Sequence, residues 1–235
     1  MSAIAYAVVA AAGNVAGAAA VAVRERRSLR VLDALIAVAA GFMVAVALTE
    51  LIPEALARGG ITAPFVILAG YLLVHLTQHT LTQHFHFGEE THVVNPTVSL
   101  SALVGLLVHT FVDGVAIASG FAVSDTLGVL VFLAVGLHKF PEGLAIASLF
   151  LAAGWGRRAA LSAGAALGLA TIAGVVTTQL AAPLTRYGLA LSAGVTLYVA
   201  ASNLVPEFQA RRGWRLAAYF FGGCALFLGV RALLS

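Results

Sequence analysis

Two histidine–carboxylate pairs stand in near-identical contexts in the middle of the chain. His109–Ser119 reads HTFVDGVAIAS and His138–Ser148 reads HKFPEGLAIAS, with seven of eleven positions identical. In each copy the imidazole and the carboxylate are four residues apart, which places them on one helix face, one turn apart. Two such helices facing each other would bring together His109, Asp113, His138 and Glu142. A set of two nitrogen and two oxygen ligands suits Zn²⁺ and accepts Fe²⁺, Mn²⁺ or Cd²⁺.

The helices that carry these residues must lie in lipid. Hydrophobic residues make up 61% of the 235 residues and charged residues only 10%, against about 25% charged in soluble domains. The mean hydropathy is +0.99. So few charged side chains cannot cover a soluble domain, and the single cysteine excludes a disulfide framework or a CxxC zinc cluster. The arginines that raise the pI to about 9.4 cluster between apolar runs, which indicates membrane topology rather than nucleic-acid binding.

Eight apolar runs are long enough to cross a bilayer, which takes about 20 residues each. They cover residues 3–23, 31–52, 61–83, 97–121, 126–152, 159–181, 187–206 and 214–234. We therefore expect an all-α polytopic membrane protein with a single transmembrane domain over residues 1–235. Lys and Arg at the ends of the spans number nine on one side and three on the other. The positive-inside rule then places both termini in the extracellular or periplasmic space and the connector 84–96 in the cytoplasm.

A second repeat relates the two halves of the chain. Gly41–Glu54 reads GFMVAVALTELIPE and Gly194–Glu207 reads GVTLYVAASNLVPE, at an offset of 153 residues. The two segments lie in spans two and seven, which run in opposite directions. This pattern predicts an inverted repeat about an axis in the membrane plane, with helices arranged 3+2+3. The alternative, that leucine-rich helix ends simply look alike, stays open.

Energy favours a functional reading of the central residues. An ionisable side chain near the bilayer centre costs about 2.5–3.5 kcal/mol on insertion scales. Five stand in the two central spans: His109, Asp113, His138, Lys139 and Glu142. A bound dication would neutralise both carboxylates. The alternative is a buried network that only joins the helices, and the duplication of the pattern argues against it.

These motifs resemble a known family. HTFVDG and HKFPEG resemble the paired HNxPEG-type signatures in the fourth and fifth helices of ZIP (Zrt-, Irt-like) divalent-metal transporters. Other features of the sequence are similar to that family too: the segments ELIPEA and NLVPEF, the eight spans, and the histidine-bearing connector after span three. The resemblance implies a 3+2+3 fold, often a homodimer, that brings Zn²⁺ or a related cation into the cytoplasm. The metal would be the substrate rather than a cofactor, and an elevator-like movement of a bundle with spans four and five would carry it.

The sequence departs from that family at the second metal position. Many members hold two metals, with Asn after the first histidine and Asn or Asp after the second, where this chain has Thr110 and Lys139. Lys139 is the sole lysine, and its ammonium beside Asp113 and Glu142 would take the charge role of a second metal. Span six carries no charge, and Thr171 aligns loosely where an acid is expected. We therefore expect one metal site, with Lys139 and Thr110 at the surrogate second position.

Two further groups could serve the route of the ion. At the inner side, a cytoplasmic exit is predicted from His75, His79, His84 and His86, the alternative being a solvated polar loop. At the outer mouth, Glu50 and Glu54 are candidates for the entrance, or are simply residues at a helix end.

The rival function is an intramembrane zinc-dependent hydrolase. The four ligands would serve, but a hydrolase also needs an open coordination position and a general base or oxyanion partner, and few other polar groups are at hand. Inverted symmetry is what alternating access requires. We predict a transporter rather than an enzyme, in a prokaryotic cytoplasmic (inner) membrane. Its partners would be the divalent ion, the lipid bilayer and a second copy of the chain, with no nucleic acid.

Overall fold

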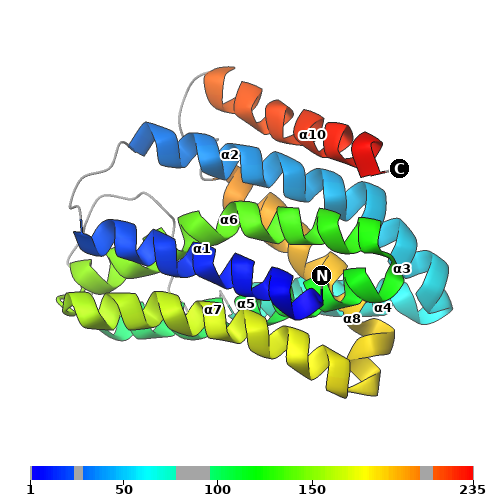
Figure 1. The fold of residues 1–235 in the computed structure, drawn as a ribbon, viewed down its shortest axis with the longest axis horizontal. Helices are drawn as coiled ribbons and strands as arrows, with labels where there is room; N and C mark the ends of the chain where they lie inside the picture. The colour runs from blue at the N-terminus through cyan, green and yellow to red at the C-terminus, as the bar shows by residue number, and fades with distance from the viewer. Residues whose placement is uncertain (1, 24–28, 78–95, 207–213, 235) are drawn as a thin grey trace.

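The protein is an elongated bundle of helices (Figure 1). The computed structural model describes residues 2–23, 29–77, 96–206 and 214–234. Within these ranges every regular element is helical and no strand occurs. The predicted all-helical fold class is confirmed.

The first half of the chain makes one helix and then a long hairpin. Helix α1 (Ala3–Val23) is followed by α2 (Leu29–Val46), which continues through the π-helical segment η1 (Ala47–Leu51) into α3 (Ile52–Gly59). A short 3₁₀ segment, η2 (Gly60–Thr62), reverses the chain into α4 (Ala63–Leu76). Gly60 has a φ of +56°, a left-handed conformation that suits a residue without a Cβ.

The second half opens with the central hairpin of α5 (Pro96–Val123) and α6 (Asp125–Ala152). Ser124 alone separates the two helices and caps α6, because its hydroxyl accepts a hydrogen bond from the Leu127 amide at 3.1 Å. Helix α7 (Arg157–Leu180) follows, then α8 (Ala182–Tyr198) with its π-helical continuation η4 (Val199–Leu204). The last helix, α10 (Trp214–Leu234), packs on α2 at the edge of the bundle (Figure 1).

The π-helical segments η1 and η4 fall at matching positions of the 153-residue repeat. η1 spans 47–51 and η4 spans 199–204, and each ends two residues before a proline, Pro53 or Pro206. Proline has no amide hydrogen to donate to the carbonyl four residues earlier. Wide turns of this kind accommodate such a break and frequently occur at functional sites.

Seven helical runs among the described residues are long and apolar enough to cross a membrane, against the eight expected from sequence. One of the seven, Asp33–Leu76, is 44 residues long, about twice what one crossing needs. This run includes the reversal of the chain at Gly60. It counts as one span because the helical structure continues through η1 and η2, although its length is enough for two crossings.

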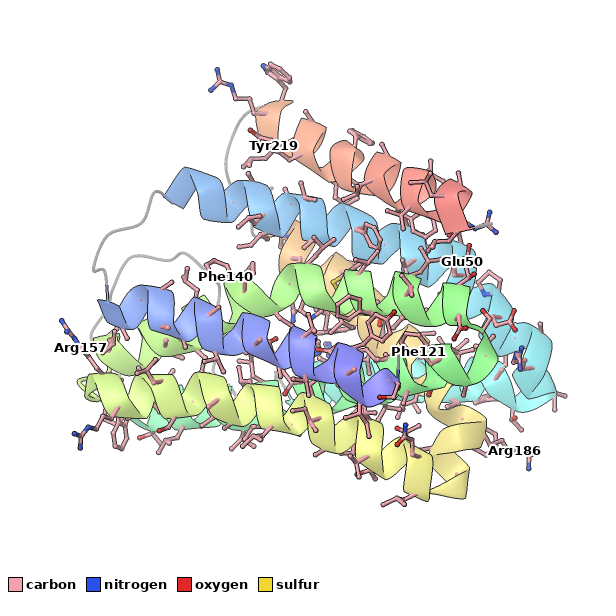
Figure 2. All side chains as sticks on the ribbon, in the orientation of Figure 1. Glu50, Phe121, Phe140, Arg157, Arg186 and Tyr219 are labelled. Carbon is pink, nitrogen blue, oxygen red and sulfur yellow. The ribbon has the colours of Figure 1, made fainter. Side chains whose placement is uncertain are left out.

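Both ends of the described chain lie at the same end of the bundle (Figure 1). Near the N-terminus, the ring of Tyr6 stacks on Phe121 with centroids 4.7 Å apart. At the other terminus, the Thr126 hydroxyl donates to the Leu234 carbonyl at 3.3 Å. Phe121 and Thr126 flank the turn between α5 and α6, so both termini lie beside that turn. Figure 2 places Arg157 and Arg186 at opposite ends of the bundle.

Candidate metal centre

The α5–α6 hairpin brings the four predicted ligands together. His109 and Asp113 come from α5, and His138 and Glu142 come from α6. One ligand atom from each residue can be chosen so that all four lie within 4.8 Å of one another. All four side chains are buried. The i, i+4 spacing accounts for this arrangement, because each pair occupies one face of its helix and the two faces meet.

The Asp113 carboxylate is the centre of the cluster. Its Oδ2 atom lies 3.3 Å from His109 Nε2 and 3.3 Å from His138 Nε2. His138 Nδ1 lies 3.0 Å from the Ala134 carbonyl, which only accepts, so Nδ1 carries the hydrogen. His138 Nε2 is therefore the atom that can bind a metal when unprotonated, in the orientation usual for metal-bound histidine.

Lys139 joins the two carboxylates. Its Nζ donates to Asp113 Oδ2 at 2.5 Å and to Glu142 Oε2 at 2.8 Å, and its side chain is fully buried. The 2.8 Å contact lies in the range of charge-assisted hydrogen bonds, and the contact with Asp113 is shorter still. The ammonium thus lies between two acids that would otherwise repel each other.

Asn14 of α1 also belongs to the cluster, and the sequence reasoning missed it. Its Nδ2 donates to Glu142 Oε2 at 3.2 Å, and the residue has no exposed surface. A signal was present in the sequence, because Asn14 is the one amide side chain in the apolar helix α1. Nothing in the spacing of α1 names the helix that it faces.

Three polar atoms of the cluster have no hydrogen-bond partner among the described residues: Glu142 Oε1, His109 Nδ1 and Asn14 Oδ1. Leaving a buried polar atom unpaired costs about 1–3 kcal/mol. Glu142 Oε1 and Asn14 Oδ1 are oxygens with lone pairs, and Glu142 is one of the four residues whose ligand atoms converge. The donor set therefore fits a metal ion chemically as well as by position.

Glycines allow the flanking helices to approach the hairpin closely. A Cβ at Gly114 of α5 would lie 2.0 Å from the Thr171 carbonyl of α7, and a Cβ at Gly143 of α6 would lie 2.0 Å from the Asn14 carbonyl of α1. Any larger residue would therefore push the helices apart. Pro141 inside α6 leaves the Leu137 carbonyl without its helical donor, which makes a polar group available near the cluster.

The other predicted site residues lie apart from this cluster or are bonded elsewhere. The Thr110 hydroxyl is buried and donates to the Leu106 carbonyl of its own helix at 2.9 Å. Glu50 pairs with Arg231 of α10, and Glu54 pairs with Arg58 at 2.5 Å. Figure 2 shows Glu50 at the end of the bundle that holds both termini.

Only one of the four predicted exit histidines is described. The His75 ring packs edge-on against Tyr198, with centroids 5.8 Å apart. His79, His84 and His86 lie outside the described residues, as does most of the connector 84–96. Their role stays a prediction.

Comparison with known protein families identifies the family of this chain. The family model described as ZIP zinc transporter matches residues 74–231, which is more than half of the chain. The chain belongs to the ZIP zinc transporter family. A comparison with curated proteins found no match.

The ZIP match contains all four clustered ligands and begins after α1, so it leaves Asn14 outside. Membership confirms the resemblance and makes this a multi-pass membrane protein of divalent metal transport. It accords with a transporter rather than an enzyme, and it makes a zinc-type metal the substrate.

Proposed function

We propose that this ZIP protein carries a divalent transition-metal ion into the cytoplasm through one site formed by His109, Asp113, His138 and Glu142. Zn²⁺ is the first choice of substrate, and Fe²⁺, Mn²⁺ and Cd²⁺ suit the same ligands. The observation that carries the proposal is the buried convergence of four ligand atoms within 4.8 Å on two antiparallel helices. No cofactor is needed, because the ion itself is the substrate.

The site holds one metal rather than two. Lys139 Nζ contacts one oxygen of Asp113 and one of Glu142, which is where a second dication would bridge the two acids. With neutral imidazoles the cluster has two negative charges and one positive charge, so its net charge is −1 before a metal binds. Binding of a single dication changes the net charge of the cluster to +1. Two dications would give a net charge of +3 in a site that is buried from water. Lys139, with Thr110 at the matching position of α5, therefore stands in place of the second metal.

The inverted repeat supports alternating access to this site. Close contacts between helices occur at equivalent positions in the two halves of the chain, when each residue in 29–76 is compared with the residue 153 positions later. Gly41 packs on the Phe220 carbonyl of α10 as Gly194 packs on the Ile67 carbonyl of α4, each with a virtual Cβ within 2.0 Å of that oxygen. The contact of α1 with α6 in the first half has its equivalent in the contact of α7 with α5 in the second half. These pairs support eight crossings in a 3+2+3 arrangement, and two termini at one end of the bundle require an even number.

Two groups of helices can move against each other. Glycine-to-carbonyl contacts with a virtual Cβ within 2.1 Å of the oxygen join α1 to α6 and α5 to α7, and separately join α2 to α10 and α4 to α8. Among the described residues, none of these contacts crosses from one group to the other. We assign the first group, which holds the metal site, as the bundle that moves in an elevator-like step, and the second as its support.

The remaining assignments follow the same orientation. Both termini face the outside, Glu50 and Glu54 mark the entrance, and His75, His79, His84 and His86 mark the cytoplasmic exit. We place the protein as a single domain over residues 1–235, in the cytoplasmic membrane of a prokaryote and as a homodimer. The positive-inside count supports the orientation.

Flux through purified protein tests the proposal. Vesicles reconstituted with the wild-type chain should take up Zn²⁺ down its gradient, reported by an enclosed fluorescent indicator. His138→Ala and Glu142→Ala should each reduce this flux to the level of empty vesicles. Ser148→Ala is a matched control on α6, because its hydroxyl donates only to the Leu144 carbonyl of the same helix at 2.8 Å. Wild-type flux in both ligand variants would disprove the assigned site.

A further inference from the structure

Asn14 is a polar residue at the metal cluster to which neither the ZIP match nor the histidine–carboxylate motifs assign a role. It stands in the middle of α1, a helix otherwise made almost wholly of Ala, Val and Gly. Its side chain is completely buried. Burying an amide group without hydrogen-bond partners costs about 1–3 kcal/mol of free energy. An asparagine at this position therefore suggests a function.

The helix packing fixes Asn14 against α6. A Cβ at Gly17 would lie 2.1 Å from the Phe140 carbonyl, and one at Gly143 would lie 2.0 Å from the Asn14 carbonyl. One turn away, a Cβ at Gly13 would lie 3.0 Å from Lys139 Cβ. Helices α1 and α6 are therefore in close contact on both sides of Asn14, which holds the backbone of Asn14 beside the part of α6 that carries Glu142.

The hydrogen bonds at Glu142 divide its two oxygens into different roles. Oε2 accepts from Lys139 Nζ at 2.8 Å and from Asn14 Nδ2 at 3.2 Å. Oε1 is buried and has no partner in the described part of the chain. Two donors therefore hold the carboxylate by one oxygen and leave the other available as a single ligand atom.

The orientation of the Asn14 amide follows from the same contact. An ionised carboxylate only accepts hydrogen bonds, so the amide atom facing Glu142 Oε2 must be the nitrogen. The carbonyl oxygen Oδ1 is then the other atom, and it is buried without a partner in the residues described. Two adjoining groups thus each keep one unpaired oxygen, and neutral amide oxygens are ligands for Mn²⁺ and similar hard cations.

We propose that Asn14 is a fifth residue of the metal site, holding Glu142 through Nδ2 and binding the cation through Oδ1. This inference rests on the proposed transport function and deepens it, since it adds one neutral oxygen from a third helix to the two imidazoles and two carboxylates. An additional oxygen favours harder ions, so Asn14 shifts selectivity towards Mn²⁺ and Zn²⁺ and away from Cd²⁺.

Metal affinity of the purified full-length protein in detergent tests the proposal. Competition with a chromophoric chelator measures the Kd for Zn²⁺, Mn²⁺ and Cd²⁺ in turn. Asn14→Ala should weaken Zn²⁺ binding by about 10–100-fold, the range found when a supporting residue of a metal site is removed, and should weaken Mn²⁺ more than Cd²⁺. Ser192→Ala on α8 is the matched control, because this hydroxyl is equally buried and also has no partner in the described ranges. Unchanged affinity for all three ions in Asn14→Ala, within twofold, would overturn the proposal.

A second variant separates the ligand from the hydrogen-bond donor. Asn14→Asp keeps an oxygen at the same place but cannot donate to Glu142 and repels it until a cation is bound. If the oxygen is a ligand, Asn14→Asp binds Zn²⁺ and Mn²⁺ more tightly than Asn14→Ala. Equal or weaker binding than in Asn14→Ala would refute ligation by Oδ1. A wild-type protein that binds no metal, or a His138→Ala variant that binds it normally, would instead refute the proposed function itself.

Discussion

Replacing Lys139 by methionine should leave two buried acids without their shared cation. The ammonium makes hydrogen bonds of 2.5 and 2.8 Å to Asp113 and Glu142, and hydrogen bonds to charged groups are each worth about 1.5–3 kcal/mol. Two of them give about 3–6 kcal/mol. Removing one partner from a buried ion pair costs about 3–5 kcal/mol, so the two figures agree. In the presence of a chelator, we expect Lys139→Met to lower the free energy of unfolding by about 3–5 kcal/mol.

Metal should recover much of that loss. A dication between Asp113 and Glu142 supplies the positive charge that methionine lacks, and a ligand at 100 times its Kd stabilises by about 2.7 kcal/mol per site. Zn²⁺ should therefore raise the unfolding temperature of Lys139→Met by more than it raises that of the wild type. Unfolding in detergent, followed with EDTA and then with Zn²⁺, measures both effects, and Ser148→Ala on the same helix serves as the control.

Either of two results would contradict this role of Lys139. One is a Lys139→Met protein as stable as the wild type in EDTA, which would mean that the ammonium does not compensate the acids. The other is the same Zn²⁺ stabilisation in both proteins, which would mean that Lys139 does not occupy a cation position.

Further predictions concern helix contact, stoichiometry, entrance and pH. Gly143→Ala should lower unfolding stability by about 1–3 kcal/mol and weaken Zn²⁺ binding, because its new Cβ would lie 2.0 Å from the Asn14 carbonyl. Gly136→Ala, whose nearest neighbour lies 4.0 Å away, should do neither, and equal losses in both would contradict the packing argument. Lys139→Asp should raise the zinc bound per chain, counted by elemental analysis, from one towards two. Glu50→Gln should raise the KM for uptake while changing unfolding stability by less than about 1 kcal/mol, since its ion-pair partner Arg231 is 54% exposed to solvent; an unchanged KM would remove Glu50 from the entrance. Zn²⁺ flux should fall as the medium is acidified, because protons compete with metal for the imidazoles and carboxylates, and flux that rises in acid would require proton coupling.

Much of the site follows from local geometry that sequence alone specifies. The i, i+4 spacing places His109 with Asp113 and His138 with Glu142 on single helix faces, and duplication of the motif implies that the two faces meet. The same alignment puts Lys139 one position after His138, close to both acids. The two ligand pairs needed only the period of a helix and the energy of burying charge in lipid, whereas the role of Lys139 also needed the resemblance to ZIP transporters.

The features that could not be predicted from sequence depend on contacts between helices that are distant in the chain. Asn14 is a single amide in an apolar run, and only the packing of α1 on α6 reveals that it reaches Glu142. The wide turns at η1 and η4 likewise depend on how the backbone accommodates Pro53 and Pro206. The reversal at Gly60 is clear as a breaker in sequence, yet the helix continues almost unbroken through it, so a count by helical run gives seven spans where apolar runs gave eight.

Anomalous X-ray scattering at the zinc absorption edge, from crystals grown with Zn²⁺, tests the central claim most directly. One strong peak is expected between α5 and α6, with nitrogen atoms of His109 and His138 and carboxylate oxygens of Asp113 and Glu142 at about 2.0–2.2 Å from it. A peak that lies away from these four side chains, or two peaks bridged by the two acids with Lys139 displaced, would contradict it.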